Sequence, residues 1–390
     1  MYRKKKNLTV AAPAEDQTSY SLSGGVFKEG DLSVGQDGLN IADHAAKLLA
    51  AVTELSLDEP ADDDNEEFSI DLPNVQSDTS LGVVNPSEAV QLNDLQRLGV
   101  VGRGAGGVVQ RALHVPTGRI FALKIIQLDV TPQVRKQILL ELTTLYKAQS
   151  PYIVKFHGAF FSEGSISICL EYMEGGALSD LCQKSGRIPE KYLCHIAEQS
   201  FTSGKTSRFK GLRGLQYMHK DRHLIHRDIK PSNLLLSSTG AVKISDFGVS
   251  GQLASTISSC VSWVGTVTYM SPERIQGKSY SVLSDIWSFG LSVMELALHA
   301  FPYPIKTEEG GLGFWELLDY IVDQPAPVLP ASESFSPEFR DFLRLSLQKN
   351  PKNRPTASEL LQHPWMQMHD TSDCNLFEWA RHNVVEPVRN

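Results

Sequence analysis

The sequence contains no apolar run long enough to cross a membrane. None of its stretches reaches 18 consecutive apolar residues, so we expect no membrane span. The basic residues 1–6 lack the apolar segment that a secretory signal needs. A net charge of −8 gives no general basic surface for nucleic acid. The five cysteines are scattered without metal-ligand or redox spacing, which favours free thiols in a reducing compartment.

Composition divides the 390 residues into three parts. Residues 1–88 are rich in Gly, Ser and Asp, and we expect a largely disordered regulatory or docking tail. Residues 92–367 have the pattern of a folded domain, with a 41% apolar content in the whole chain that is sufficient for a core. Residues 368–390 are expected to be a C-terminal tail.

The folded part reads as strands followed by helices. The expected strands span 95–101, 108–115, 120–126 and 166–171, and one helix at 132–147 interrupts them. From about residue 174 the pattern is mostly helical. This order predicts an α+β fold, with a small antiparallel-sheet lobe at about 92–173 and a larger helical lobe at about 174–367.

Three glycines, Gly102, Gly104 and Gly107, have G-x-G-x-x-G spacing. Glycine lets backbone amides approach a phosphate without a Cβ clash. Alone, the motif also fits a dinucleotide-binding turn or a merely flexible hairpin. Because a strand, and not a helix, follows the motif, we favour a hairpin that covers phosphates.

Two charged residues occupy positions that the apolar pattern would bury. Lys124 lies in an apolar strand, where the alternative is an edge position facing outward. Glu141 falls on the buried stripe of the 132–147 helix. A carboxylate there is costly without a cation, so we expect Glu141 to hold Lys124, and Lys124 to hold the α- and β-phosphates of a nucleotide.

The most specific motif is His-Arg-Asp-Ile-Lys-Pro-Ser-Asn at 226–233, followed by Asp-Phe-Gly at 246–248. Phosphoryl transfer needs oxygen ligands for Mg²⁺, an acceptor for the hydroxyl proton and cations for developing charge. Asn233 and Asp246 supply the oxygens, Asp228 the acceptor and Lys230 a cation. A polar loop whose side chains only cap turns would not need this full string.

These motifs, in this order, resemble those of eukaryotic protein kinases over roughly residues 95–367. The resemblance implies a two-lobed kinase fold that uses ATP and Mg²⁺, with Asp228, Lys230, Lys124 and Glu141 as catalytic residues. It also implies a structural ion pair between Glu273 and Arg354. The implied ATP-binding residues are Gly102, Gly104, Gly107, Val109, Ala122, Lys124, Leu170, Glu171 and Met173.

Less common sequence motifs indicate the subfamily. Gly106, in the place of a frequent aromatic residue, and the segments 152–160, 166–173 and 246–253 look like those of MAP kinase kinases. The resemblance makes Leu170 the residue beside adenine, with backbone hydrogen bonds from Glu171 and Met173. It implies phosphorylation of Thr and Tyr in a MAP kinase. The alternatives are a serine/threonine kinase acting higher in the cascade, or a catalytically impaired scaffold.

The segment between Gly248 and Gly265 has the length of plant-type activation loops. By that resemblance, Thr256 and Ser262 are the phosphorylation sites of an upstream MAP kinase kinase kinase. Arg227, beside Asp228, would bind the phosphate through charge-assisted hydrogen bonds. A Ser-rich loop that is merely solvated is the competing interpretation.

The N-terminal segment resembles the docking peptide by which MAP kinase kinases bind their substrate. Its residues are Arg3, Lys4, Lys5, Lys6, Leu8 and Val10. A generic basic tail is the alternative. Apolar residues at helical spacing over 41–57 fit a nuclear export signal, an autoinhibitory helix or a transient amphipathic helix equally well. We therefore expect a cytoplasmic protein, with shuttling through the nucleus if the export signal is real and a nuclear export receptor binds it.

Residues 200–210 do not fit the family pattern. They form a polar, Ser/Thr-rich insert within the long helix expected before the catalytic loop. Gly204, Lys205 and Thr206 suggest a phosphate-binding loop, but Gln199 stands where that motif needs glycine. The insert is either a genuine bulge or an unspliced intron in the gene sequence, and it could weaken the large lobe.

Overall fold

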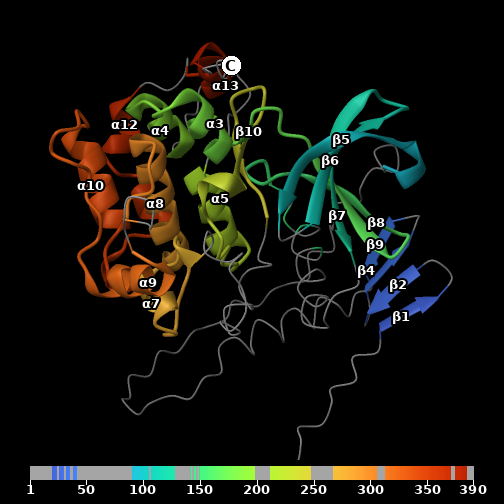
Figure 1. The fold of residues 1–390 in the computed structure, drawn as a ribbon, viewed down its shortest axis with the longest axis horizontal. Coiled ribbons are helices and arrows are strands. Elements are labelled where there is room, and N and C mark those ends of the chain that lie inside the picture. Colours follow the sequence, from blue (N-terminus) through green and yellow to red (C-terminus); the bar gives the residue numbers. More distant parts are fainter. Residues whose placement is uncertain are drawn as a thin grey trace, which may run out of the picture.

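The fold is described by a computed structural model. It covers residues 20–23, 26–29, 32–35, 38–41, 90–104, 107–127, 142, 145, 148, 150–197, 211–246, 267–304, 312–369 and 374–383. A five-stranded antiparallel sheet lies on one side of the molecule and a group of helices on the other (Figure 1). This arrangement confirms the predicted α+β architecture with a sheet lobe and a helical lobe.

The small-lobe sheet has the strand order β5-β6-β7-β9-β8. The strands are β5 (Leu95–Gly104), β6 (Gly107–His114), β7 (Arg119–Gln127), β8 (Phe156–Ser162) and β9 (Ser165–Glu171). Because side chains alternate along a strand, Phe121 and Leu123 of β7 enter one apolar cluster, whereas Ile126 faces the other side. Lys124 shares the face of Ile126 by the same alternation. β8 is not among the strands predicted from the sequence.

The helix expected at 132–147 is described at two positions only. Leu142 and Leu145 are helical, and both are buried at 0% and 4% exposure. They belong to the same cluster as Ile126, Ile166 and Ile168. Leu142 and Leu145, two positions of the predicted apolar stripe, therefore lie against the small-lobe sheet.

A second antiparallel sheet precedes the small lobe. Its strands are β1 (Tyr20–Ser23), β2 (Val26–Glu29), β3 (Leu32–Gly35) and β4 (Gly38–Ile41), in sequential order. β3 and β4 contact β8, and Val34 of β3 is completely buried in the larger core cluster. Figure 1 shows this sheet beside β8 and β9. The expectation that residues 1–88 are largely disordered is therefore wrong for these four strands, whose four residues each carry too little apolar signal to indicate a strand.

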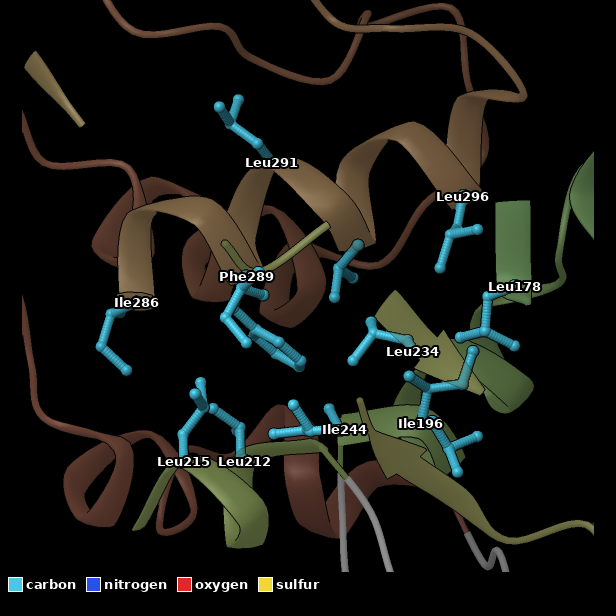
Figure 2. Packing of buried hydrophobic residues seen from close by; sticks show 14 of the residues in the cluster. Leu178, Ile196, Leu212, Leu215, Leu234, Ile244, Ile286, Phe289, Leu291 and Leu296 are labelled. Atoms are coloured by element: carbon cyan, nitrogen blue, oxygen red, sulfur yellow. The ribbon is translucent and has the colours of Figure 1, made fainter. Parts of the chain in front are cut away.

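The large lobe is built around α8 (Leu283–Leu298), whose side chains are buried on almost every face. Phe289 projects from α8 toward Leu212 and Ile244 in the core (Figure 2). Ser288 and Ser292 donate their hydroxyls to carbonyls one turn earlier, so their burial leaves no hydroxyl unpaired. The helix ends at Leu298, and the next residue, His299, adopts the left-handed conformation.

The remaining helices surround α8. They are α3 (Leu178–Ser185), α4 (Glu190–Ala197), α5 (Gly211–Gln216), α7 (Pro272–Ile275), α9 (Phe314–Asp323), α10 (Pro337–Ser346), α11 (Ala357–Leu360), α12 (Trp365–Met368) and α13 (Leu376–Asn383). Local signals explain where α10 starts. Ser336 caps this helix by accepting a hydrogen bond from the Phe339 amide, and Pro337 follows it at the first helical position. Among the described helices, none has the length and apolar character of a membrane span.

A small sheet joins the two lobes, with the order β10 (Gly176–Ala177), β11 (Leu234–Leu236) and β12 (Val242–Ile244). An isolated bridge between Ile153 and Ile244 connects it to the segment before β8. The loops that flank β11 and β12 carry residues 226–233 and 245–246, so this sheet sets the distance between the two most specific motifs.

Candidate active site

A buried carboxylate holds the backbone of the loop at 226–233. Asp285, near the start of α8, accepts hydrogen bonds from the backbone amides of His226 and Arg227, both at 2.8 Å. His219 also donates to it at 2.9 Å. Burial alone would raise the pKa of Asp285, but these donors more than offset it and hold the pKa below its usual value. An ionised carboxylate therefore fixes the loop backbone.

His226 connects this loop to the one that carries Asp246. Its Nε2 donates to the Ser245 carbonyl at 3.0 Å, and its Nδ1 accepts from the Asp228 amide at 3.3 Å. Burial lowers the pKa of His226, although nearby carboxylates oppose the shift. The neutral ring thus bridges both loops. A backbone bond from the Ser245 amide to the Asn233 carbonyl at 2.9 Å reinforces the connection.

Asp228, Lys230 and Asn233 form one cluster. The Asp228 carboxylate lies 3.0 Å from the Lys230 ammonium and accepts from the Asn233 amide nitrogen at 2.9 Å. That nitrogen also donates to the Asp228 carbonyl at 2.8 Å. With its amide nitrogen turned toward Asp228, Asn233 keeps its side-chain oxygen for another ligand.

Lys124 reaches across the cleft to Asp246. Its ammonium lies 2.7 Å from Oδ1 of Asp246, and Lys124 is only 6% exposed. Burial would raise the pKa of Asp246, but the Lys124 charge and hydrogen bond hold it below its usual value. The side chain of Glu141, the predicted partner of Lys124, lies outside the described residues. The described residues thus show Lys124 paired with Asp246, and the Lys124–Glu141 pair stays a prediction.

Lys124 and Asp246 line a cavity of about 730 Å³, whereas Asp228, Lys230 and Asn233 do not line it. Seven of the nine predicted nucleotide residues line it: Gly102, Val109, Ala122, Lys124, Leu170, Glu171 and Met173. Asp246 lines it as well, whereas Gly104 and Gly107 do not. These two glycines pair with each other at the tip of the β5–β6 hairpin.

Gly107 has a structural reason to be glycine that the sequence argument did not foresee. Its φ is +118°, and a Cβ there would lie 2.2 Å from the Ile125 carbonyl oxygen. The close approach is therefore to β7. We had attributed the need for glycine at this position to the phosphate.

Hydrogen bonds fix residues 171–173, the segment that is expected to bind adenine. The Glu171 carboxylate accepts two hydrogen bonds from Lys243, both at 2.7 Å. The Glu171 amide donates to the Lys155 carbonyl at 2.8 Å, and the Met173 carbonyl accepts from the Gly176 amide at 3.0 Å. The backbone of this segment is therefore fixed at Glu171 and Met173, and among the described residues outside helices and strands the Met173 amide has no backbone acceptor.

Arg227 lies beside the side chain of Arg274 and the aromatic ring of Tyr280. Its φ is +71°, its guanidinium lies 5.5 Å from the Tyr280 ring centroid, and its carbonyl accepts from Arg274 at 2.7 Å. Its Nε is buried without a hydrogen-bond partner among the described residues. A buried guanidinium nitrogen of this kind fits an anionic ligand.

Glu273 and Arg354 form the expected ion pair. Both are buried, and two parallel hydrogen bonds of 2.8 and 2.7 Å join them. Arg354 also donates to the Leu283 and Gln348 carbonyls. Burial would raise the pKa of Glu273, but Arg354 lowers it below its usual value. The pair ties α7 to α8 and to the segment before α11.

Several predicted sites lie outside the described residues. These are Glu141, the phosphosites Thr256 and Ser262, the docking residues Arg3, Lys4, Lys5, Lys6, Leu8 and Val10, and the insert 200–210. Three site features were missed by the sequence analysis: the anchor Asp285, the Arg274–Tyr280 surroundings of Arg227, and α13. No pattern in the sequence gives the partners of Asp285.

Comparison with known proteins decides the family. Residues 95–366 match the protein kinase domain. The chain is 40% identical over 375 residues to "Mitogen-activated protein kinase kinase SIPKK" of Nicotiana tabacum, covering 95% of this chain and 93% of the relative. This chain belongs to the MAP kinase kinase family.

Further relatives agree with this membership. "Mitogen-activated protein kinase kinase 2" of Arabidopsis thaliana is 41% identical over 374 residues, covering 95% of this chain and 92% of the relative. "Dual specificity mitogen-activated protein kinase kinase dSOR1" of Drosophila melanogaster is 44% identical over 307 residues, covering 74% of each chain. The predicted family, kinase fold and dual-specificity enzyme class are confirmed. Membership also implies ATP as substrate and the use of Mg²⁺ in general.

Proposed function

We propose that this MAP kinase kinase transfers the γ-phosphoryl group of ATP to a Thr and a Tyr in the activation loop of a MAP kinase, and that residues 124–246 carry the chemistry. The observation that supports it most is a set of contacts that joins the two motifs. Lys124 binds Asp246, and His226 connects the neighbouring Ser245 carbonyl to the Asp228 amide. Lys124, Ser245 and Asp246 also line one cavity. Phosphoryl transfer depends mainly on positioning and electrostatics, which such a set provides.

Asp228 would accept the proton of the attacking hydroxyl as the new O–P bond forms and the bond to the β-phosphate oxygen breaks. Lys230, 3.0 Å from Asp228, would balance the charge on the transferring group. ADP leaves with the bonding electron pair. Asp228 is suited to this role because its own backbone is fixed through His226 and Asn233.

Asn233 and Asp246 fit Mg²⁺. They offer an amide oxygen and a carboxylate, and Mg²⁺ usually takes one or two protein oxygens together with phosphate oxygens and water. A bound Mg²⁺ would neutralise charge on the phosphates. The lowered pKa of Asp246 keeps its carboxylate ionised for this role.

Adenine recognition follows from the backbone groups described above. The adenine amino group is a donor and its ring nitrogens are acceptors, so the Glu171 carbonyl and the Met173 amide are a complementary pair. Leu170, opposite Ala122 in the sheet, would limit the depth of the base.

We further propose activation by phosphorylation of Thr256 and Ser262 by an upstream kinase, with Arg227 as phosphate ligand. The buried, unpartnered Nε of Arg227 supports this proposal. Persistence of full activation after Thr256→Ala and Ser262→Ala substitution would contradict it.

Two further proposals rest on sequence pattern alone. They are substrate docking through residues 3–10, and cytoplasmic location with nuclear export through 41–57. Deletion of residues 1–10 should raise KM for a MAP kinase and spare a generic protein substrate. Leu55→Ala with Leu57→Ala should retain the protein in the nucleus.

The test of the main proposal is site mapping. Protein with Thr256→Glu and Ser262→Glu is incubated with Mg-ATP and a MAP kinase that lacks its own activity. Phosphate on both Thr and Tyr of the T-x-Y loop is the expected result. Phosphate on Ser or Thr elsewhere would indicate the kinase one step higher in the cascade, and ATP binding without transfer would indicate an impaired scaffold.

A further inference from the structure

The C-terminal helix α13 is a folded element, although the sequence suggested a tail. The Asn375 side-chain oxygen caps its first turn by accepting from the amides of Phe377 at 3.1 Å and Glu378 at 3.3 Å. Leu376 and Ala380, at 0% and 4% exposure, enter the large-lobe core. The burial of these two side chains at helical spacing fixes which face of α13 points inward.

Two further contacts fix the position of α13. Trp379 packs on Tyr192 of α4 with ring centroids 5.3 Å apart. Gly240 has a φ of +81°, and a Cβ there would lie 2.6 Å from the Asn375 side-chain oxygen, so the β11–β12 turn closely abuts the cap. α13 also contacts α3. The helix is therefore docked by the cap, the core face and the aromatic pair together.

A neighbouring face of α13 borders the nucleotide cavity, with Ala380 at the boundary between this face and the buried one. Phe377, Ala380 and Arg381 line the cavity that Lys124, Asp246, Glu171 and Met173 also line. Asp180 and Lys184 of α3 lie along it too. Figure 1 shows α13 close to α3 and β10.

The two ends of the cavity differ in chemistry. Lys124 and Asp246 form the polar end, where phosphates and metal belong. The segment from Glu171 to Met173 forms the end for the base. Because α13 contacts α3, which follows that segment directly, Phe377 and Arg381 lie on the nucleoside side of the cavity and away from the phosphate end.

We propose that Phe377 binds the nucleoside end of ATP as an apolar wall against the ribose and base, and that Arg381, a cation at the rim that lies 3.5 Å from Glu378, attracts the anionic nucleotide as a whole. This inference rests on the proposed function, because it requires ATP to occupy this cavity. Phe377 is half-buried, so a ligand would remove further apolar surface from water. The Arg381 side chain is 66% exposed, so its attraction for the anionic nucleotide is weak and screened by salt.

The test compares two ligands that share the nucleoside. Affinity for Mg-ATP and for adenosine is measured by calorimetry, together with KM and kcat. Phe377→Ala should weaken both ligands by about the same factor, about fivefold to tenfold. It should raise KM for ATP and spare kcat, and Phe377→Leu should restore most of the loss. Arg381→Ala should weaken Mg-ATP by about twofold to threefold at low salt, with adenosine unaffected.

His382→Ala is the matched control, since His382 is exposed on the same helix and does not line the cavity. Unchanged affinities for both ligands in Phe377→Ala would overturn this inference alone. A lower Tm with unchanged affinity would do the same, because it would reduce Phe377 to a packing role. If the unaltered protein bound no Mg-ATP, the proposed function and this inference would both fail.

Discussion

At the scale of single residues, the site depends on a few buried groups whose charge is fixed by their neighbours. Asp285 stays ionised beneath the catalytic loop, His226 stays neutral between two loops, and Asp246 stays ionised beside Lys124. Each state follows from hydrogen bonds that the sequence motif does not display. The motif predicted which residues carry the chemistry, and the structure shows what holds them in place.

The first prediction concerns Asp285. Asp285→Asn keeps the size of the side chain but removes the charge and places an amide NH₂ where two backbone N–H groups need acceptors. We expect kcat to fall by about 10- to 100-fold, because the catalytic loop loses its position. Mg-ATP affinity should change little, since Asp285 does not line the cavity.

Asp319→Asn is the matched control, because Asp319 is an exposed carboxylate on α9. The comparison is made by steady-state kinetics and nucleotide calorimetry on both variants. Full activity in Asp285→Asn would show that the anchor is dispensable.

The second prediction concerns the pH dependence of the Glu273–Arg354 pair. The folded-state pKa of Glu273 lies below the ordinary value of 4.5, so the pair stabilises the fold fully above about pH 4.5 and loses this contribution as pH falls through the folded-state pKa. Glu273→Gln leaves Arg354 buried without its anion. We expect the free energy of unfolding to drop by about 3–5 kcal/mol at pH 7.

Urea unfolding at pH 7 and near pH 4 measures this difference. The difference in the free energy of unfolding between wild type and Glu273→Gln should be smaller at the lower pH. Glu333→Gln, which breaks the exposed pair with Arg187, should cost at most about 1 kcal/mol at pH 7. An equal gap at both pH values would contradict the assigned protonation.

At the scale of elements, α4 and α5 are arranged like parts of one helix. α4 ends at Ala197 and α5 begins at Gly211. A Cβ on Gly211 would lie 3.3 Å from the Ile196 carbonyl oxygen, and both segments are buried in the large-lobe core. If residues 200–210 were removed, Gly211 would stand four residues after Ile196, which is the spacing of an α-helical hydrogen bond.

The third prediction follows from this arrangement. Deletion of 200–210 should join α4 and α5 and remove the entropic cost of closing the insert. We expect Tm to rise by roughly 2 °C or more, with kcat retained or increased. Lys205→Ala within the insert is the control and should leave Tm unchanged. A fall in Tm after the deletion, measured by scanning calorimetry, would show that the insert itself contributes to the fold.

At the scale of the whole molecule, the large helical lobe and the small-lobe sheet could be predicted because their patterns are strong. Lys124 and Asp228 could be assigned because each belongs to a motif with fixed spacing. The N-terminal sheet could not, since its four-residue strands carry little apolar signal and Val34 is buried only through contact with the small lobe.

The same limit applies to α13 and Asp285. Residues 376–383 have a helical apolar pattern, but sequence alone does not show that the helix returns to the nucleotide cavity. The role of Asp285 depends on amides that lie 58 and 59 residues away. Tertiary contacts of this kind exist only once the chain is folded.

The most direct measurement is phosphoryl transfer to a MAP kinase by protein carrying Thr256→Glu and Ser262→Glu, with and without Asp228→Asn. The account predicts that Asp228→Asn lowers kcat by at least about 100-fold, because the acceptor of the hydroxyl proton is lost, while Mg-ATP affinity is kept. Transfer at an undiminished rate in Asp228→Asn would contradict it, since the chemistry would then lie outside the site described.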